Sequence, residues 1–83
     1  MTTKAQSIAR FIESCASLFG FSYHGAYGNV DPCYHPDTGE VDYLLYFDGE
    51  EQTVHTVEDA MNTPFIAGRT LADVAVEIEI TEM

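Results

Sequence analysis

Hydrophobic side chains recur with helical spacing over the first twenty residues of the chain. From Ala5 to Phe19 they return at intervals of three, four and seven residues, which places them on one stripe of an amphipathic α-helix. Thr2 or Thr3 can cap the N-terminus of this helix, and Gly20 suits the left-handed residue that often follows a helix C-terminus. The pattern therefore predicts a helix from about Thr3 to Phe19.

A β-hairpin is predicted over residues 41–57. Val41–Phe47 is rich in β-branched and aromatic residues, and hydrophobic and polar residues alternate over Gln52–Val57. Asp48-Gly49 between them suits a two-residue type I′ turn, which would fix the register of the two strands. The expected cross-strand pairs are Phe47 with Glu50, Leu45 with Gln52, Tyr43 with Val54, and Asp42 with His55.

This register divides the hairpin into two faces, because successive side chains of a strand point to opposite sides. The face expected to join the core consists of Val41, Tyr43, Leu45, Phe47 and Val54. The other face is acidic with apolar residues set into it, and it consists of Asp42, Leu44, Tyr46, Glu51, Thr53, His55 and Val57.

Weaker patterns precede the hairpin. Residues 21–30 alternate loosely but contain Gly25 and Gly28, and glycine weakens strands. We therefore expect an irregular edge strand or an extended loop there. Pro36–Gly39 predicts a turn, because proline fixes φ and glycine accepts the left-handed conformation.

Two capped elements are expected after the hairpin. Thr56 can cap a short helix over residues 57–61. Thr70 and Asp73 have the spacing of a capping box, whereas the alternation over residues 76–81 fits a strand as well as a helix. We favour a helical start at Thr70 followed by an extended end.

These elements predict an α+β fold in which the N-terminal helix packs on a small antiparallel sheet. The sheet would have two to four strands around the 41–57 hairpin, followed by the short helix and a capped C-terminal helix or strand. The 83 residues are expected to form a single small domain, 1–83. No apolar run is long enough to cross a membrane, and the two cysteines and the lack of a secretory-signal pattern favour a reducing cytoplasm.

Negative charge is distributed very unevenly along the chain. Thirteen of the fourteen carboxylates lie from Asp31 onwards, where Arg69 is the only cation. Residues 31–59 hold nine acidic residues and no lysine or arginine. Like charges this close repel one another, which should raise many carboxyl pKa values, and they also repel nucleic acid and anionic membranes. The composition therefore argues against direct nucleic-acid binding and favours a basic protein partner.

Candidate chemistry is sparse. Cys33 and His35 form one C-x-H pair, which falls short of the four ligands of a structural metal site. We expect the two side chains to point to opposite faces, which argues against activation of the Cys33 thiol by His35. Asp42 facing His55 resembles the orienting half of a catalytic triad, but no nucleophile is placed beside it. A cross-strand charge pair is the simpler interpretation.

Motifs for calcium and phosphate binding are missing. The acidic stretch does not match the spacing of an EF-hand loop, and no glycine-rich phosphate-binding motif occurs. We therefore expect no cofactor and no enzymatic activity.

In size, acidity and lack of a catalytic motif, the chain resembles small phage-encoded inhibitors. These include uracil-DNA glycosylase inhibitors, anti-restriction DNA mimics and anti-CRISPR proteins. The resemblance implies a DNA mimic that blocks a basic nucleic-acid-binding protein. The acidic surface itself suggests how such a partner would be bound, with complementary potentials to speed encounter and embedded aromatics such as Tyr46 and Tyr34 as anchors. The residues expected to bind the partner are Asp31, Asp37, Glu40, Asp42, Tyr46, Asp48, Glu50, Glu51, Glu58 and Asp59.

Three alternatives stay open beside this hypothesis. The first is an acidic soluble domain without mimicry, in which the charge serves solubility alone. The second is a small metal-binding or redox module that uses Cys33 and His35. The third is a structural or assembly subunit that forms a homodimer through Phe11 and Leu18, which flank the apolar stripe of the first helix. The simpler interpretation of that flank is a wide core face.

Overall fold

A five-stranded antiparallel sheet with the order β4-β3-β2-β1-β5 forms the centre of the protein. The computed structural model describes residues 3–14 and 18–82. In chain order the elements are α1 (Lys4–Glu13), β1 (Phe19–Tyr23), β2 (Ala26–His35), β3 (Glu40–Phe47), β4 (Glu50–Val54), α2 (Val57–Asn62), α3 (Leu71–Val74) and β5 (Glu79–Glu82). None of the helices among the described residues is long and apolar enough to cross a membrane.

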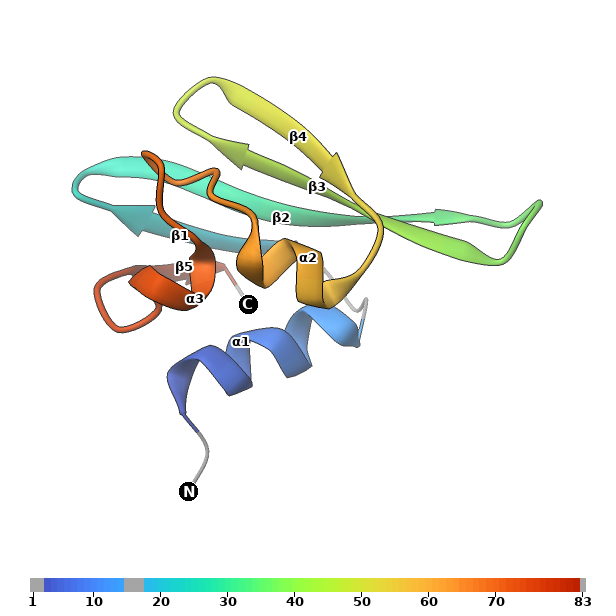
Figure 1. Ribbon diagram of the computed structural model, residues 1–83, viewed down its shortest axis with the longest axis horizontal. Helices are drawn as coiled ribbons and strands as arrows, with labels where there is room; N and C mark the ends of the chain where they lie inside the picture. The colour runs from blue at the N-terminus through green and yellow to red at the C-terminus, as the bar shows by residue number, and fades with distance from the viewer. Residues whose placement is uncertain (1–2, 15–17, 83) are drawn as a thin grey trace.

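The helices lie on one side of the sheet, which confirms the predicted α+β fold (Figure 1). Every buried hydrophobic side chain of the sheet points to that side, and with the helices these side chains form one core. Among the described residues no helix covers the opposite side of the sheet, which we call the open face. The largest fully buried core side chains are Phe19, Phe21, Ile8, Leu45, Ile66, Leu71, Val30 and Val74.

The N-terminal helix is shorter than predicted. Its start is confirmed, since the Thr3 hydroxyl accepts a hydrogen bond from the Gln6 backbone N–H at 3.1 Å and the Gln6 side chain accepts one from the Thr3 N–H at 2.9 Å. The helix ends at Glu13, however, and Phe19 and Gly20 belong to β1. The spacing of buried side chains changes at this point from the 3.6-residue period of a helix to the two-residue period of a strand, because alternate side chains of β1 enter the core. Residues 15–17, which the prediction placed in the helix, lie outside the described residues.

Phe11 and Leu18, the residues predicted to flank the apolar stripe of the first helix, are partly buried. Phe11 is half-buried against the core, and its ring centroid lies 6.3 Å from that of Phe19. Leu18 is also half-buried. These positions fit the core-face interpretation, and a homodimer seam through Phe11 and Leu18 stays a prediction.

The segment 21–30 is not the irregular edge that was predicted. It forms a regular hairpin with a two-residue turn at His24 (φ 49°) and Gly25 (φ 84°). β1 lies between β2 and β5, and this part of β2 lies between β1 and β3. Gly28 does not weaken the strand; it gives the ring of Phe21 room to lie against the backbone. The sheet consequently has five strands rather than two to four.

The end of the β2–β3 hairpin projects beyond the rest of the sheet (Figure 1). The pairing of β2 with β1 extends to Val30, and within the described part of the chain Pro32 pairs with Tyr43 of β3 alone. The predicted turn at the tip is confirmed, with Gly39 at φ 76° and its N–H donating to the His35 carbonyl at 2.8 Å.

The register of the β3–β4 hairpin is confirmed. Tyr43 pairs with Val54, Leu45 with Gln52 and Phe47 with Glu50 across a turn at Asp48 (φ 47°) and Gly49 (φ 91°). One facing assignment was wrong. Val57 starts α2 and packs against the core, because the chain leaves the sheet after Val54.

Both predicted caps are present. The Thr56 hydroxyl accepts from the Asp59 N–H at 3.0 Å at the start of α2. Thr70 and Asp73 form the predicted capping box, with the Asp73 N–H donating to the Thr70 hydroxyl at 3.1 Å. The ambiguous C-terminal segment starts as the short helix α3 and ends as β5, as favoured.

Candidate functional site

The open face of the sheet carries most of the polar chemistry of the chain. The strand register places alternate residues of each strand on this face. Its side chains are Ser22 on β1, Tyr27, Asn29, Asp31, Cys33 and His35 on β2, Glu40, Asp42, Leu44 and Tyr46 on β3, Glu51 and Thr53 on β4, His55 just after β4, and Glu79 and Glu82 on β5.

The carboxylates of the open face follow the register in successive rows. Tyr46 and Glu51 form one row, Asp31 and Leu44 the next, and then come the rows that contain Asp42 and Glu40. Neighbouring rows are two residues apart along a strand, a distance of about 7 Å. The face therefore presents negative charge at a regular repeat along the β2–β3 hairpin.

All three lysine and arginine side chains of the chain lie away from the open face. Lys4 and Arg10 belong to α1, where the Lys4 ammonium donates to the Ile78 carbonyl at 2.8 Å. Arg69 precedes α3 and donates to the Tyr23 hydroxyl at 3.1 Å and to Glu77 at 3.0 Å. The three cations therefore lie on the helical side, which also carries carboxylates, whereas the carboxylates of the open face have no lysine or arginine on their own face.

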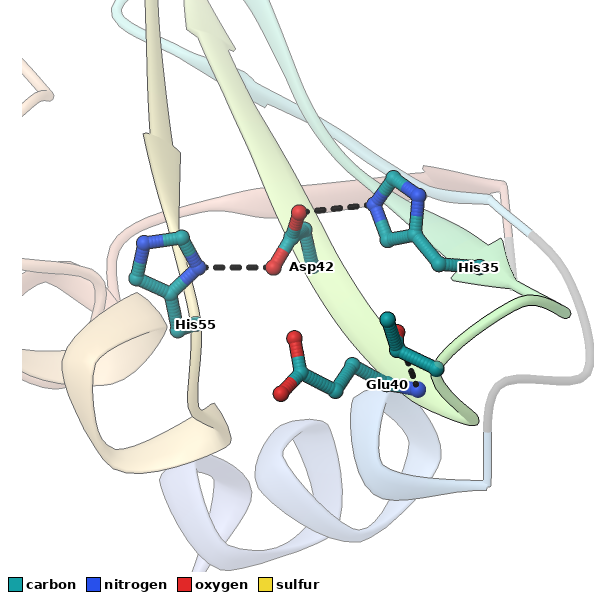
Figure 2. Close-up of polar contacts among 5 residues, drawn as sticks. His35, Glu40, Asp42 and His55 are labelled. Carbon is teal, nitrogen blue, oxygen red and sulfur yellow. Dashed lines mark hydrogen bonds and ion pairs between the residues drawn. The ribbon is translucent and has the colours of Figure 1, made fainter.

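Asp42 bridges two histidines at the projecting end of the open face (Figure 2). Its Oδ2 lies 2.7 Å from Nε2 of His35, and its Oδ1 lies 2.6 Å from Nδ1 of His55. Since the carboxylate only accepts hydrogen bonds, each of these ring nitrogens carries the hydrogen. The side chain of Asp42 is 22% exposed, against 46% for His35 and 77% for His55. We call these three residues the His–Asp–His cluster.

Within the cluster, the pKa values of Asp42 and His55 are shifted in opposite directions. Hydrogen bonds from His55 and from His35 hold the pKa of the Asp42 carboxyl below its ordinary value. The hydrogen bond to Asp42 and its charge raise the pKa of His55, and the charges of Glu40 and Asp59 add to this. The sequence predicts raised carboxyl pKa values, and at Asp42 that prediction is wrong because two histidine donors outweigh the repulsion.

Glu40 extends the acidic surface next to the cluster. Its backbone N–H donates to the Thr38 hydroxyl at 3.3 Å, which connects it to the turn at the hairpin tip (Figure 2). A solvent-open hollow of about 440 Å³ is lined by Glu40, Val41, Asp42 and His55. Two carboxylates and one imidazole therefore border a single concave surface.

A second feature of the open face is a pair of tyrosines. The ring centroids of Tyr27 and Tyr46 lie 6.4 Å apart. The Tyr27 hydroxyl donates to Oε1 of Glu82 at 2.8 Å, and this bond is the main cause of the raised pKa of Tyr27. Gly20 lies beneath Tyr27 and Glu82. A Cβ atom at Gly20 would meet the Tyr27 hydroxyl and the Glu82 carboxylate oxygen at 3.0 Å each. The aromatic pair lies between Glu82 of β5 and Glu51 of β4, at the end of the rows away from the hairpin tip.

The structure brings together five of the ten residues predicted to bind a partner: Asp31, Glu40, Asp42, Tyr46 and Glu51 all lie on the open face. Glu50 points to the helical side, and Glu58 and Asp59 belong to α2, although Asp59 is close enough to influence His55. Asp37 and Asp48 occupy the turns at opposite ends of β3. The predicted anchor Tyr34 is 63% exposed and lies on the other side of β2 from the acidic rows.

Sequence reasoning missed several members of the open face, namely His35 as a partner of Asp42, and Tyr27, Glu79 and Glu82. For His35 the signal was present. The expectation that Cys33 and His35 point to opposite faces is wrong, because residues two apart on a regular strand share a face. Glu82 could not be placed, since the β1–β5 pairing is irregular between Gly20 and Phe21.

Cys33 is an exposed free thiol on the open face, opposite Asp42 in the register. Cys15 lies outside the described residues. Within residues 3–14 and 18–82, no group of three or more histidine, cysteine or acidic side chains is arranged to hold a metal ion. His35 is engaged by Asp42 instead of pairing with Cys33 as a ligand set.

No protein-family model, curated protein or solved structure matches the chain. Functional assignment therefore depends on the side chains of the open face.

Proposed function

We propose that this chain is a non-enzymatic acidic binding protein whose open face occupies the nucleic-acid-binding groove of a basic partner protein. The observation that supports this proposal is that no lysine or arginine lies on the acidic open face. Every lysine and arginine lies on the helical side, while the open face carries Asp31, Glu40, Asp42, Glu51, Glu79 and Glu82. Complementary potentials of this kind accelerate encounter and select a basic partner.

The spacing of the carboxylates supports mimicry of a phosphate backbone. Successive rows repeat at about 7 Å, which is roughly twice the axial rise of about 3.4 Å per nucleotide on one strand of DNA. A groove lined with arginine and lysine could therefore meet one carboxylate for every second phosphate. Tyr27 and Tyr46 supply the aromatic area that binding hot spots favour, at the end of these rows that lies away from the hairpin tip.

Occupation of that groove would exclude nucleic acid, so the protein would act as an inhibitor of the phage-encoded DNA-mimic type. Such a target lies in the cytoplasm, where a free thiol such as Cys33 stays reduced. The projecting end of the β2–β3 hairpin would reach furthest into the groove, since it extends beyond the core (Figure 1).

Two neighbouring glutamates on β4 provide a matched test. Glu51 lies on the open face and Glu50 on the helical side, and both are exposed. We expect Glu51→Lys to weaken binding of a partner captured from a host lysate by about tenfold or more, because it places a cation opposite the basic groove. Glu50→Lys makes the same change in net charge and should alter affinity less than about threefold.

The captured partner must also bind duplex DNA in a mobility-shift assay, and the wild-type protein must displace that DNA. Adding Glu40→Lys to Glu51→Lys should deepen the loss, and the wild-type affinity should fall as salt rises. Equal affinities for the Glu50 and Glu51 variants, or a partner that binds DNA and this protein simultaneously, would rule out the proposal.

A further inference from the structure

The His–Asp–His cluster gives the acidic open face a means of changing its charge near neutral pH. Histidine is the side chain whose ordinary pKa, about 6.5, lies in this range. His35 and His55 are the only residues of that type among the described open-face side chains, and both contact the same carboxylate. The cluster lies at the projecting end of the hairpin, within the surface proposed to bind the basic partner.

The hydrogen-bond geometry lets both rings gain a proton without rearrangement. Asp42 already engages Nε2 of His35 and Nδ1 of His55, so these two nitrogens carry hydrogen in the neutral rings. The second nitrogen of each ring, Nδ1 of His35 and Nε2 of His55, is the one that takes up a proton. Protonation therefore changes the charge of the face and leaves both bonds to Asp42 in place.

The charged groups around His55 favour the protonated form of its ring. His55 faces Asp42 and Glu40 from β3 and Asp59 from α2, and these carboxylates raise its pKa. His35 faces Asp42 and its cross-strand partner Glu40, with the thiol of Cys33 two residues earlier on β2. All lysine and arginine side chains lie elsewhere, so no described cation opposes proton uptake.

Two protons cancel the acidity of this end of the face. At alkaline pH, Glu40 and Asp42 contribute two negative charges beside two neutral rings. With both rings protonated, the local charge falls to zero while Asp31, Glu51, Glu79 and Glu82 stay negative. A basic partner would then meet two cations at the projecting end of the hairpin.

We propose that the His–Asp–His cluster is a proton-operated regulator of the open face, which releases a basic partner as the pH falls from about 8 to about 5.5. This inference rests on the proposed function, since it assumes that the open face is the binding surface. Linkage makes the effect reciprocal: binding of a basic partner should expel protons from the cluster. The pKa of His55 should therefore fall when a basic probe binds.

Substitutions can remove the titration and keep the hydrogen bonds. The amide of glutamine places a donor where Nε2–H of His35 lies, and that of asparagine places one where Nδ1–H of His55 lies. The test variant is therefore the double substitution His35→Gln and His55→Asn. His24→Asn is the control, because His24 occupies the β1–β2 turn at φ 49°, where asparagine before glycine is favoured.

The probe is a fluorescently labelled peptide of ten arginines, measured by anisotropy at low salt at pH 8 and pH 5.5. We expect wild-type protein and the His24 variant to bind on the order of fivefold more weakly at pH 5.5, as losing two exposed charge contacts predicts. The double variant should change less than twofold. In an NMR titration of the wild-type protein, the peptide should lower the pKa of His55.

The outcomes separate the inference from the proposed function. The pH regulation is disproved if peptide binding by the double variant keeps the full pH dependence, or if the peptide leaves the pKa of His55 unchanged. Either result leaves the assignment of the open face as the binding surface intact. If Glu51→Lys and Glu50→Lys bind the peptide equally at pH 8, the open face is not the binding surface, and both proposals fall together.

Discussion

The ring of Phe21 lies directly against the backbone of Gly28: a Cβ atom at this glycine would come within 2.5 Å of Cζ of Phe21. The two residues are cross-strand partners at the centre of the β1–β2 hairpin. The Phe21 ring also stacks on Phe47, with centroids 6.4 Å apart, so it cannot move away without disturbing the core. Gly28 therefore sets how closely β1 and β2 pack beneath the helices.

Gly28→Ala should destabilise the protein by roughly 1–3 kcal/mol, the usual cost of overpacking a core. The matched control is Gly20→Ala on the opposite face of the sheet. There the added Cβ meets the ends of Tyr27 and Glu82 at 3.0 Å, and exposed side chains can shift. Urea denaturation of both variants measures the difference, and a Gly28 variant as stable as the Gly20 variant would contradict this packing.

The 41–57 hairpin was predictable because its signals are local. Asp48-Gly49 fixes the turn, the turn fixes the register, and the register assigns each side chain to a face. Thr56 and Thr70 likewise mark the starts of helices, because each hydroxyl accepts a hydrogen bond from the backbone N–H three residues later. These features require no knowledge of the rest of the molecule.

The β1–β2 hairpin was missed because its evidence is tertiary. Gly28 looks like a strand breaker until the Phe21 ring is packed against it, and His24-Gly25 is not a common type I′ pair. Helical spacing from Ile12 to Phe19 continues across the helix end by coincidence, and only burial of Phe19 beside Phe21 shows the change of period. The pairing of β5 with β1 joins segments about sixty residues apart, which local pattern cannot reveal.

The candidate site was predictable to the same degree. Asp42 facing His55 followed from the hairpin register, and the structure confirms the contact at 2.6 Å. The second contact, from His35, depends on β2 pairing with β3 across the Pro36–Gly39 turn. Once that turn is recognised as a hairpin connection, His35 is brought to the face of Asp42.

Because one face of β3 joins the core and the other is exposed, truncation of two adjacent leucines should lower the free energy of unfolding by very different amounts. Leu45 is fully buried, whereas Leu44 is half-exposed on the open face. Leu45→Ala should cost about 2–5 kcal/mol through lost burial and a residual cavity. Leu44→Ala should cost less than about 1 kcal/mol, as expected for partial burial. Chemical denaturation measures the stability of both variants. A Leu44→Ala variant less stable than Leu45→Ala would show that the two side chains are assigned to the wrong faces of β3.

The capping box of α3 should contribute measurably despite the shortness of that helix. Thr70→Ala removes the acceptor of the Asp73 N–H, a bond of 3.1 Å, and should destabilise the protein by about 1 kcal/mol. Thr70→Ser keeps the hydroxyl and should restore most of the stability. Thermal melts of the two variants compare them, and an alanine variant as stable as the serine variant would show that the cap adds nothing.

Stability should increase as the pH falls from about 8.5 to about 5.5. The raised pKa of His55 means that its interaction with Asp42 stabilises the folded state fully below the ordinary histidine pKa of about 6.5. That contribution is lost as the pH rises through the raised folded value. Asp42 has a lowered pKa, so its contribution persists above the ordinary value of about 3.9 and is lost in stronger acid.

Repulsion among the open-face carboxylates also lowers the stability of the folded state at pH 8.5, and salt should weaken this repulsion. Thermal melts at pH 5.5 and 8.5, each at low and high salt, separate the two causes. His55→Asn should flatten the pH dependence and leave the salt dependence at pH 8.5 unchanged, because the substitution removes the titrating ring but no carboxylate. A lower melting temperature at pH 5.5 than at pH 8.5 in the wild-type protein would contradict the contribution of His55, since its raised pKa requires the native state to bind more protons than the unfolded chain in this range.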